Sequence, residues 1–98
     1  MARLKKKDIE PINVIVTIDN QLTYKCNYIK TTSRITYNIY CEQTEVRRNI
    51  IVQNYPKADI YNLTPYKNLL QEVINSAAMD AKILDININI YNYEHKIV

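Results

Sequence analysis

Residues 12–28 read INVIVTIDNQLTYKCNY and hold the clearest structural signal in the chain. On both sides of Asp19-Asn20, apolar residues occupy every second position. They are Ile12, Val14, Val16 and Ile18 before the dipeptide, and Leu22, Tyr24, Cys26 and Tyr28 after it. Alternation with a period of two is typical of a strand with one buried face, and Asp-Asn is a turn signal. The stretch predicts an antiparallel β-hairpin.

The parity of these apolar positions predicts the length of the turn. A two-residue loop at Asp19-Asn20 would pair Val16 with Thr23 and would place the two apolar sets on opposite faces. A three-residue loop pairs Val16 with Tyr24 instead, so that both sets share one face. We therefore expect the three-residue loop.

Two further runs extend the sheet. After a polar turn at residues 31–33, apolar residues alternate again, at Ile35, Tyr37, Ile39 and Cys41. A fourth strand is predicted from Val46 to Gln53, and residues 55–59, which include Pro56, end it. Consecutive alternating strands joined by short polar turns are typical of an antiparallel meander.

One amphipathic helix follows. Thr64 is a favoured N-cap residue, and Pro65 is a favoured first helical residue. Apolar residues then recur at spacings of three and four, which places them on one stripe of the helix. The stripe comprises Leu69, Leu70, Val73, Ile74, Ala77, Ala78 and Ala81, and the polar residues opposite to it are Lys67, Gln71, Glu72, Asn75 and Ser76.

The last alternating run, Leu84 to Tyr91, predicts a final strand with one aliphatic face. The predicted fold class is therefore α+β: an antiparallel sheet of about five strands in the order ββββαβ, with one amphipathic helix packed on one face. At 98 residues the chain is expected to form a single domain over residues 12–98, preceded by a basic arm at residues 1–11.

The composition excludes several classes of function. The chain has no Gly, whereas phosphate-binding loops, dinucleotide fingerprints and nucleophile elbows need Gly where the backbone approaches a ligand or turns sharply. No apolar run reaches the ~20 residues of a membrane span, and no apolar segment follows the basic start as in a secretory signal. We therefore expect a cytoplasmic protein that is neither secreted nor membrane-spanning.

The residues that carry chemistry are few and scattered. His95 is the only histidine and lies near the C-terminus, where a general base has no evident partner. Cys26 and Cys41 fall on the apolar sides of their strands, where Cys packs as a small hydrophobic residue. Together with His95 they are too few for a structural zinc site. We predict free thiols, no catalytic, cofactor or metal site, no small-molecule substrate, and therefore no enzyme.

A basic arm and one sheet face are the candidate partner-binding surfaces. The arm contains Arg3, Lys5, Lys6 and Lys7, which suit contact with phosphate or an acidic protein, or simply keep the chain soluble. The face opposite to the helix is predicted to carry Thr23, Lys25, Asn27, Ile29, Arg34, Thr36, Asn38, Tyr40, Asp85, Asn87, Asn89 and Tyr91. Partner binding on this face is assigned to Lys25, Arg34, Tyr40, Asn87, Asn89 and Tyr91.

Composition and edge pattern favour protein partners for these surfaces. Tyr, Asn and Thr are typical of protein contacts, although an AT-rich genome would also enrich a merely solvated face in Tyr and Asn. Neither Val46–Gln53 nor Leu84–Tyr91 carries a Pro or an inward charge, so whichever of them lies at a sheet edge is open to pairing.

The leading functional hypothesis is a non-catalytic structural or assembly protein that binds protein subunits, including itself. The composition suits a component of a bacteriophage or virus particle, such as a head–tail, tail or baseplate part, found in the virion or the host cytoplasm. Two alternatives stay open. One is a small module for single-stranded nucleic acid, because Tyr40 and Tyr91 could stack bases beside Lys25 and Arg34. The other is a virus-encoded inhibitor of a host protein.

Overall fold

The computed structural model describes residues 10–98, and the arm residues Arg3, Lys5, Lys6 and Lys7 lie outside this range. The described elements are the strands β1 (Ile12–Ile18), β2 (Leu22–Lys30), β3 (Ile35–Cys41) and β4 (Arg47–Val52), the helices α1 (Lys57–Ile60) and α2 (Thr64–Leu84), and the strand β5 (Tyr93–Ile97). The short helix α1 occupies the segment that was predicted only to break the fourth strand.

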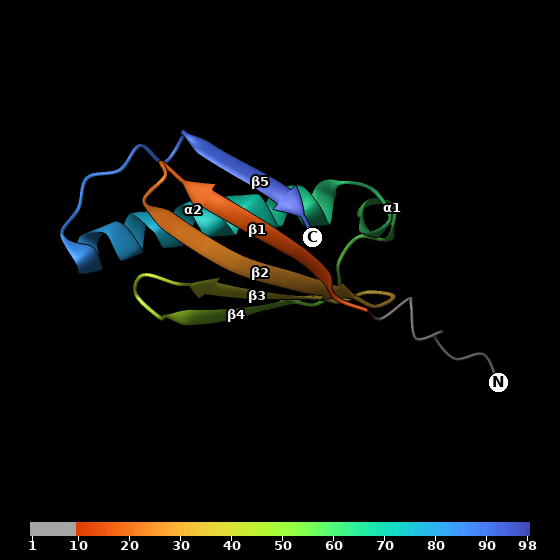
Figure 1. The fold of residues 1–98 in the computed structure, drawn as a ribbon. Helices are drawn as coiled ribbons and strands as arrows, with labels where there is room; N and C mark the ends of the chain where they lie inside the picture. The colour runs from red at the N-terminus through yellow and green to blue at the C-terminus, as the bar shows by residue number, and fades with distance from the viewer. Residues whose placement is uncertain (1–9) are drawn as a thin grey trace.

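The five strands form one antiparallel sheet in the order β4-β3-β2-β1-β5. Strands β1 to β4 follow one another as a meander, and α2 then runs along one face of the sheet before β5 pairs with β1 (Figure 1). The predicted α+β class and the order ββββαβ are confirmed. Strands β4 and β5 form the two edges.

The first hairpin has the predicted register. Ile18 pairs with Leu22 and Val16 pairs with Tyr24, so three residues separate the paired strands. Asp19 and Asn20 both adopt positive φ, at 50° and 55°, and Gln21 N–H closes the turn on the carbonyl of Ile18 at 2.9 Å. The apolar residues of both strands consequently face the same side of the sheet.

A chain without Gly places other residues in the left-handed region. Five described residues have positive φ, namely Asp19, Asn20, Glu45, Asn54 and Asp85. Four of them are Asp or Asn, whose short polar side chains tolerate this conformation best after Gly. The turns therefore follow ordinary turn chemistry in spite of the missing residue type.

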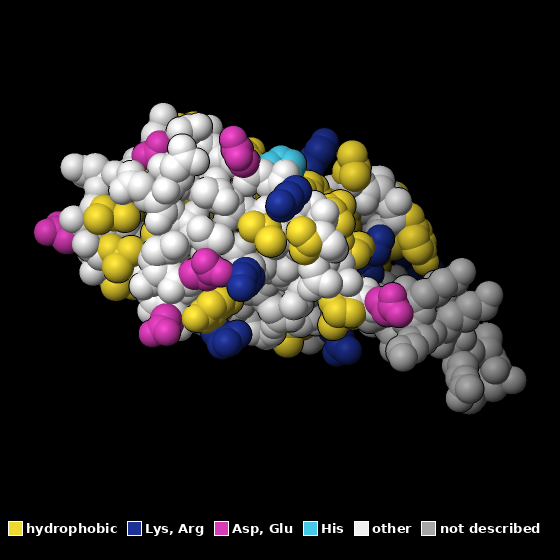
Figure 2. All heavy atoms as spheres, viewed as in Figure 1, with side chains coloured by type: hydrophobic (Ala, Val, Ile, Leu, Met, Phe, Trp, Pro, Cys, Tyr) yellow, Lys and Arg dark blue, Asp and Glu magenta, His cyan; other side chains and the backbone are white. Residues whose placement is uncertain are grey.

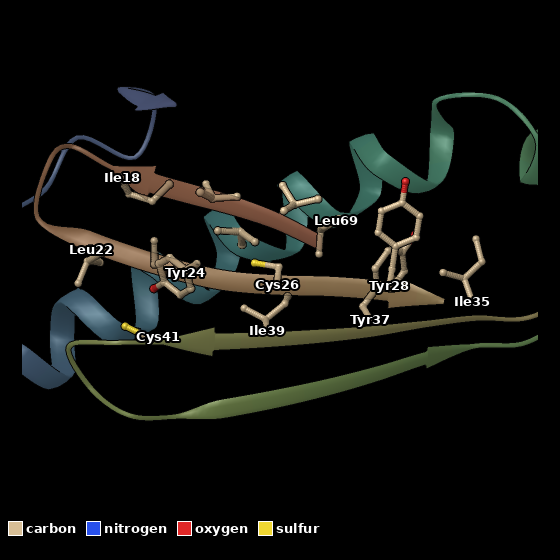
Figure 3. Packing of buried hydrophobic residues seen from close by; sticks show 14 of the residues in the cluster. Ile18, Leu22, Tyr24, Cys26, Tyr28, Ile35, Tyr37, Ile39, Cys41 and Leu69 are labelled. Atoms are coloured by element: carbon tan, nitrogen blue, oxygen red, sulfur yellow. The ribbon is translucent and has the colours of Figure 1, made fainter. Parts of the chain in front are cut away.

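The core lies between α2 and one face of the sheet (Figure 3). The strand residues predicted from alternation are buried, from Val14 in β1 to Cys41 in β3, and α2 contributes Leu69, Val73 and Ala77. Burying each large side chain contributes about 1.5–3 kcal/mol. The hydroxyl of Tyr37 donates to the carbonyl of Pro65 at 2.9 Å, which satisfies a polar atom inside this core.

The helix begins one residue earlier than predicted. Thr64 is the first helical residue rather than its cap, and Asn62 Oδ1 accepts the backbone N–H of Thr64 at 2.7 Å. Ser76 was expected on the polar side but is buried, where its hydroxyl donates to the carbonyl of Glu72 at 2.9 Å. Over residues 10–98, neither helix has the length and hydropathy that a membrane crossing requires.

The strand predicted from Leu84 to Tyr91 is wrong. Helix α2 continues to Leu84, Asp85 ends it with a φ of 54°, and the strand lies later, as β5. Ile86, Ile88 and Ile90 nevertheless pack against the core in a loop, while their neighbours are exposed. The alternation therefore indicated correctly that every second side chain packs against the core, but it did not indicate a strand. The residues that follow, in β5, form the backbone hydrogen bonds with β1.

Candidate functional site

No element within residues 10–98 covers the face of the sheet opposite to α2 over the four meander strands. Its side chains alternate with the buried ones and are half-buried or exposed, and the helix lies behind the strands in the view of Figure 1. They are Asn13, Ile15, Thr17, Thr23, Lys25, Asn27, Ile29, Thr36, Asn38, Tyr40, Arg47, Asn49 and Ile51. We call this set the open face.

Figure 2 shows the open face as a mixed surface. On this side of the molecule, single hydrophobic side chains lie among separate Lys/Arg and Asp/Glu side chains and polar surface. The open face itself contains two cations, Lys25 and Arg47, and no carboxylate. A large apolar patch would indicate an obligate interface, and a basic stripe would indicate nucleic acid. The open face has neither character.

A row of four asparagines crosses the open face. Asn13, Asn27, Asn38 and Asn49 are successive cross-strand partners from β1 to β4. The Asn38 amide nitrogen donates to Asn27 Oδ1 at 2.9 Å, and the Asn49 amide nitrogen donates to Asn38 Oδ1 at 2.6 Å. The row therefore has a direction, and within residues 10–98 its last acceptor, Asn49 Oδ1, receives no hydrogen bond.

A second row lies beside the asparagines. Lys25, Tyr40 and Arg47 are cross-strand partners on β2, β3 and β4. The guanidinium carbon of Arg47 lies 4.3 Å from the centre of the Tyr40 ring, which is a cation–π contact, and Lys25 Nζ lies 3.1 Å from Glu42 Oε1. The two rows line a shallow hollow of about 380 Å³. Its chemistry combines amides, two cations and one aromatic ring.

The structure brings together part of the predicted site and separates the rest. Lys25 and Tyr40 are adjacent partners on the open face. Arg34 lies at its margin, exposed in the connection between β2 and β3. Asn87, Asn89 and Tyr91 do not lie on this face, and neither does Asp85, because residues 85–92 form the loop between α2 and β5.

The asparagines of that loop have a structural role. Asp19 at the tip of the first hairpin accepts the backbone N–H of Asn89 at 2.9 Å and the side-chain amide of Asn92 at 3.0 Å. Gln21 donates to the carbonyl of Asn87 at 3.0 Å. The hydrogen bond from the Asn89 backbone, together with that from Asn92, lowers the pKa of Asp19. The hairpin tip thus holds the loop in place.

A buried carboxylate was missed by the sequence analysis. Asp80 on α2 is 0% exposed and forms a two-pronged ion pair with Arg48 of β4, with N···O distances of 3.0 and 2.9 Å. Its Oδ2 also accepts the hydroxyl of Tyr24 at 2.5 Å, and its Oδ1 accepts that of Thr44 at 3.4 Å. Three elements, α2, β4 and β2, and the turn between β3 and β4 therefore meet at this one side chain.

The electrostatics of this cluster favour the charged form of Asp80. Burial alone would raise the pKa of Asp80, but hydrogen bonds from Arg48 and Tyr24 and the charge of Arg48 outweigh burial and lower it. Burial and the bond to Asp80 raise the pKa of Tyr24. Two sequence signals mark the cluster in retrospect. Asp80 lies three residues after buried Ala77 on the apolar stripe of the helix. Arg48 occupies one of the alternate positions of β4 whose side chains are on the helix side of the sheet.

The remaining candidates for chemistry are apart from one another. His95 Nδ1 lies 2.6 Å from the hydroxyl of Tyr66, which links β5 to α2. Cys26 and Cys41 are free and buried, as predicted, and their cross-strand partners are Ile39 and Tyr24. In residues 10–98, no three His, Cys, Asp or Glu side chains are grouped as ligands for a metal ion.

No protein-family model, no curated protein and no solved structure matches the chain. The functional argument therefore depends on the open face, the sheet edges and the buried cluster alone.

Proposed function

We propose that this chain is a non-catalytic assembly protein that binds other protein subunits, including copies of itself, through its sheet. One observation carries the proposal. The open face presents two ordered rows of amide, aromatic and cationic side chains that no described element covers. Amides and tyrosine supply hydrogen bonds and rigid contact area at low entropic cost, which is typical of protein contacts.

The positions of the charges support a protein partner over a nucleic acid. The ring of Tyr40, which would have to stack on a base, already carries the guanidinium of Arg47. Lys25, which would have to bind a phosphate, is paired with Glu42. Binding of a single strand would have to displace both contacts. The assignment to a bacteriophage or virus particle stays a prediction from composition.

The first experiment measures the molar mass of the full chain by light scattering after size exclusion, at low and at high salt. We expect a multimer that persists at high salt and whose absorbance ratio shows no nucleic acid, because amide and apolar contacts are little screened. A monomer at high protein concentration would contradict the assembly function.

The same measurement tests the nucleic-acid alternative. A monomer that elutes with nucleic acid at low salt and releases it at high salt would replace our proposal with that alternative. In that case Tyr40→Ala should weaken binding, whereas Tyr61→Ala should not. Tyr61 is a suitable control because it is 81% exposed and lies between α1 and α2, away from the open face.

A further inference from the structure

We propose that the hollow on the open face holds an acidic segment of a partner protein, with one carboxylate of that segment bound by the guanidinium of Arg47. The proposal rests on the assembly function above and names the chemistry of its partner. The hollow measures about 380 Å³ and lies between the asparagine row and the row of Lys25, Tyr40 and Arg47. Its charge, its fixed guanidinium and its excess of hydrogen-bond donors all fit a carboxylate.

Arg47 is the uncompensated charge of the hollow. Lys25 forms an ion pair with Glu42. Arg48 is directed to the helix side and is neutralised by Asp80, so β4 does carry an inward charge, contrary to the sequence prediction that this strand has none. Arg47 is exposed, and no carboxylate within residues 10–98 forms an ion pair with it. A partner that supplies one negative charge therefore balances the site.

The ring of Tyr40 holds this guanidinium in place. The two residues are direct cross-strand partners on β3 and β4, and the guanidinium carbon lies 4.3 Å from the centre of the ring. A cation–π contact does not use the N–H groups of Arg47 as hydrogen-bond donors. These groups form a planar fork that matches the two oxygens of a carboxylate. Because the arginine is ordered before binding, less side-chain entropy is lost when the partner docks.

The amides beside Arg47 add further donors to the hollow. The side-chain nitrogens of Asn38 and Asn49 each donate one hydrogen along the row, and each has a second hydrogen that no acceptor in the described part of the chain receives. Of the two side-chain oxygens, only Oδ1 of Asn49 lacks a hydrogen bond. Donors therefore outnumber acceptors among the amides and the guanidinium. A carboxylate accepts hydrogen bonds and donates none, so it fits this surface better than a neutral amide does.

The charge of the hollow also limits which surface can supply the carboxylate. The open face contains cations and no carboxylate, so a second copy docked face to face would offer Arg47 only like charges. The carboxylate therefore comes from a surface other than the open face. A phosphate also fits the fork of Arg47, but single-strand binding needs a base stacked on Tyr40, and the guanidinium already occupies that ring. The protein carboxylate is the better match.

Binding of a synthetic acidic peptide to the full chain tests the proposal. The probe is a short fluorescein-labelled peptide of alternating glutamate and serine, and the control peptide has glutamine in place of every glutamate. Fluorescence anisotropy should show that Arg47→Gln raises the dissociation constant of the glutamate peptide about tenfold. Lys67→Gln is the matched control, because it removes the same charge from an exposed position on α2, across the sheet from the hollow. It should change the constant less than about twofold.

Variants that keep the net charge separate a fixed site from general attraction. Tyr40→Leu removes the ring that holds Arg47 and should raise the dissociation constant about fivefold, whereas Tyr40→Phe keeps the ring and should bind like the wild type. Arg47→Lys keeps the charge but removes the fork, and should weaken binding about threefold. Circular dichroism checks that each variant is folded. Equal binding by the wild type, Tyr40→Leu and Arg47→Lys would mean that net charge alone attracts the peptide, and would overturn the proposal.

The outcomes separate this proposal from the function on which it rests. A wild-type monomer that binds neither peptide would overturn both. A monomer that binds the glutamate peptide through Arg47 and Tyr40 would support the site and contradict the assembly function alone. A multimer whose peptide binding is unchanged by Arg47→Gln would overturn the acidic docking site alone. An oligothymidylate that binds through Arg47 more tightly than the glutamate peptide would assign the hollow to nucleic acid and overturn both.

Discussion

The two faces of the sheet are formed by the same strands, but the residues of one face pack in the core against α2, whereas those of the other face are half-buried or exposed. On the helix side, Val16 is 1% exposed and lies among residues that exclude water. Its neighbour Ile15 is equally aliphatic but is half-buried on the open face. Stability therefore constrains the helix side at nearly every position, whereas the open face is free to be selected for contacts.

The largest expected difference between the faces comes from a charge placed on each. Val16→Asp should leave the domain unfolded, because it buries an unpaired carboxylate in a small core. Ile15→Asp should fold, since position 15 lies between Lys25 and Lys96 in the register of the sheet. Circular dichroism and urea unfolding of both variants check this. A folded Val16→Asp protein would show that the buried side has been assigned wrongly.

The next largest effect is expected at the polar cluster that ties α2 to the sheet. Asp80→Ala leaves the Arg48 guanidinium, whose side chain is 18% exposed, without its partner. Removing one member of a buried pair costs about 3–5 kcal/mol. Glu72→Ala on the same helix should cost less than about 1 kcal/mol. Equal unfolding free energies for the two variants would mean that Asp80 contributes no more than a surface residue.

Acid should destabilise the domain through the buried carboxylate on the helix side. The folded pKa of Asp80 lies below its unfolded value of about 3.9, so its contribution is present above that pH and is lost as the pH falls through the folded pKa. Urea midpoints recorded from about pH 6 to about pH 2 should therefore decline. The decline should be shallower in Asp80→Asn, which cannot ionise at this position.

The smallest effect is expected within the asparagine row. Asn38→Thr removes both side-chain hydrogen bonds of Asn38. These bonds lie on an open face, where water can replace them, and Thr has the higher strand propensity. The unfolding free energy should change by no more than about 0.5 kcal/mol. A loss as large as that of a core substitution would show that the row stabilises the fold and not only contacts.

The sequence allowed the faces and the first register to be predicted because both depend on local parity. Val16 pairs with Tyr24 since only an odd loop keeps their apolar sets together. The residues Lys25 and Tyr40 were placed correctly on the open face for the same reason. Parity of this kind needs no knowledge of distant residues.

The errors lie where partners distant in sequence decide. Ile86 and Ile88 alternate like strand residues, yet the sheet position beside β1 went to Tyr93–Ile97. Asp80 was not singled out in the sequence, because its partner Arg48 lies 32 positions away. Asn89 looked like a contact residue, but its backbone holds the carboxylate of Asp19. Periodicity indicates which side chains of one segment are buried, but it does not indicate which segments pack against each other.

The buried cysteines have a practical consequence. Burial raises the pKa of the Cys26 thiol to about 12, and a thiol reacts with alkylating reagents as the thiolate. Cys26 and Cys41 both lie between the sheet and α2, so a reagent reaches them only when these layers separate. The rate of alkylation of the wild-type chain therefore measures how often the domain opens. The chain has no Trp, so tryptophan fluorescence cannot follow its opening, but the two buried thiols can.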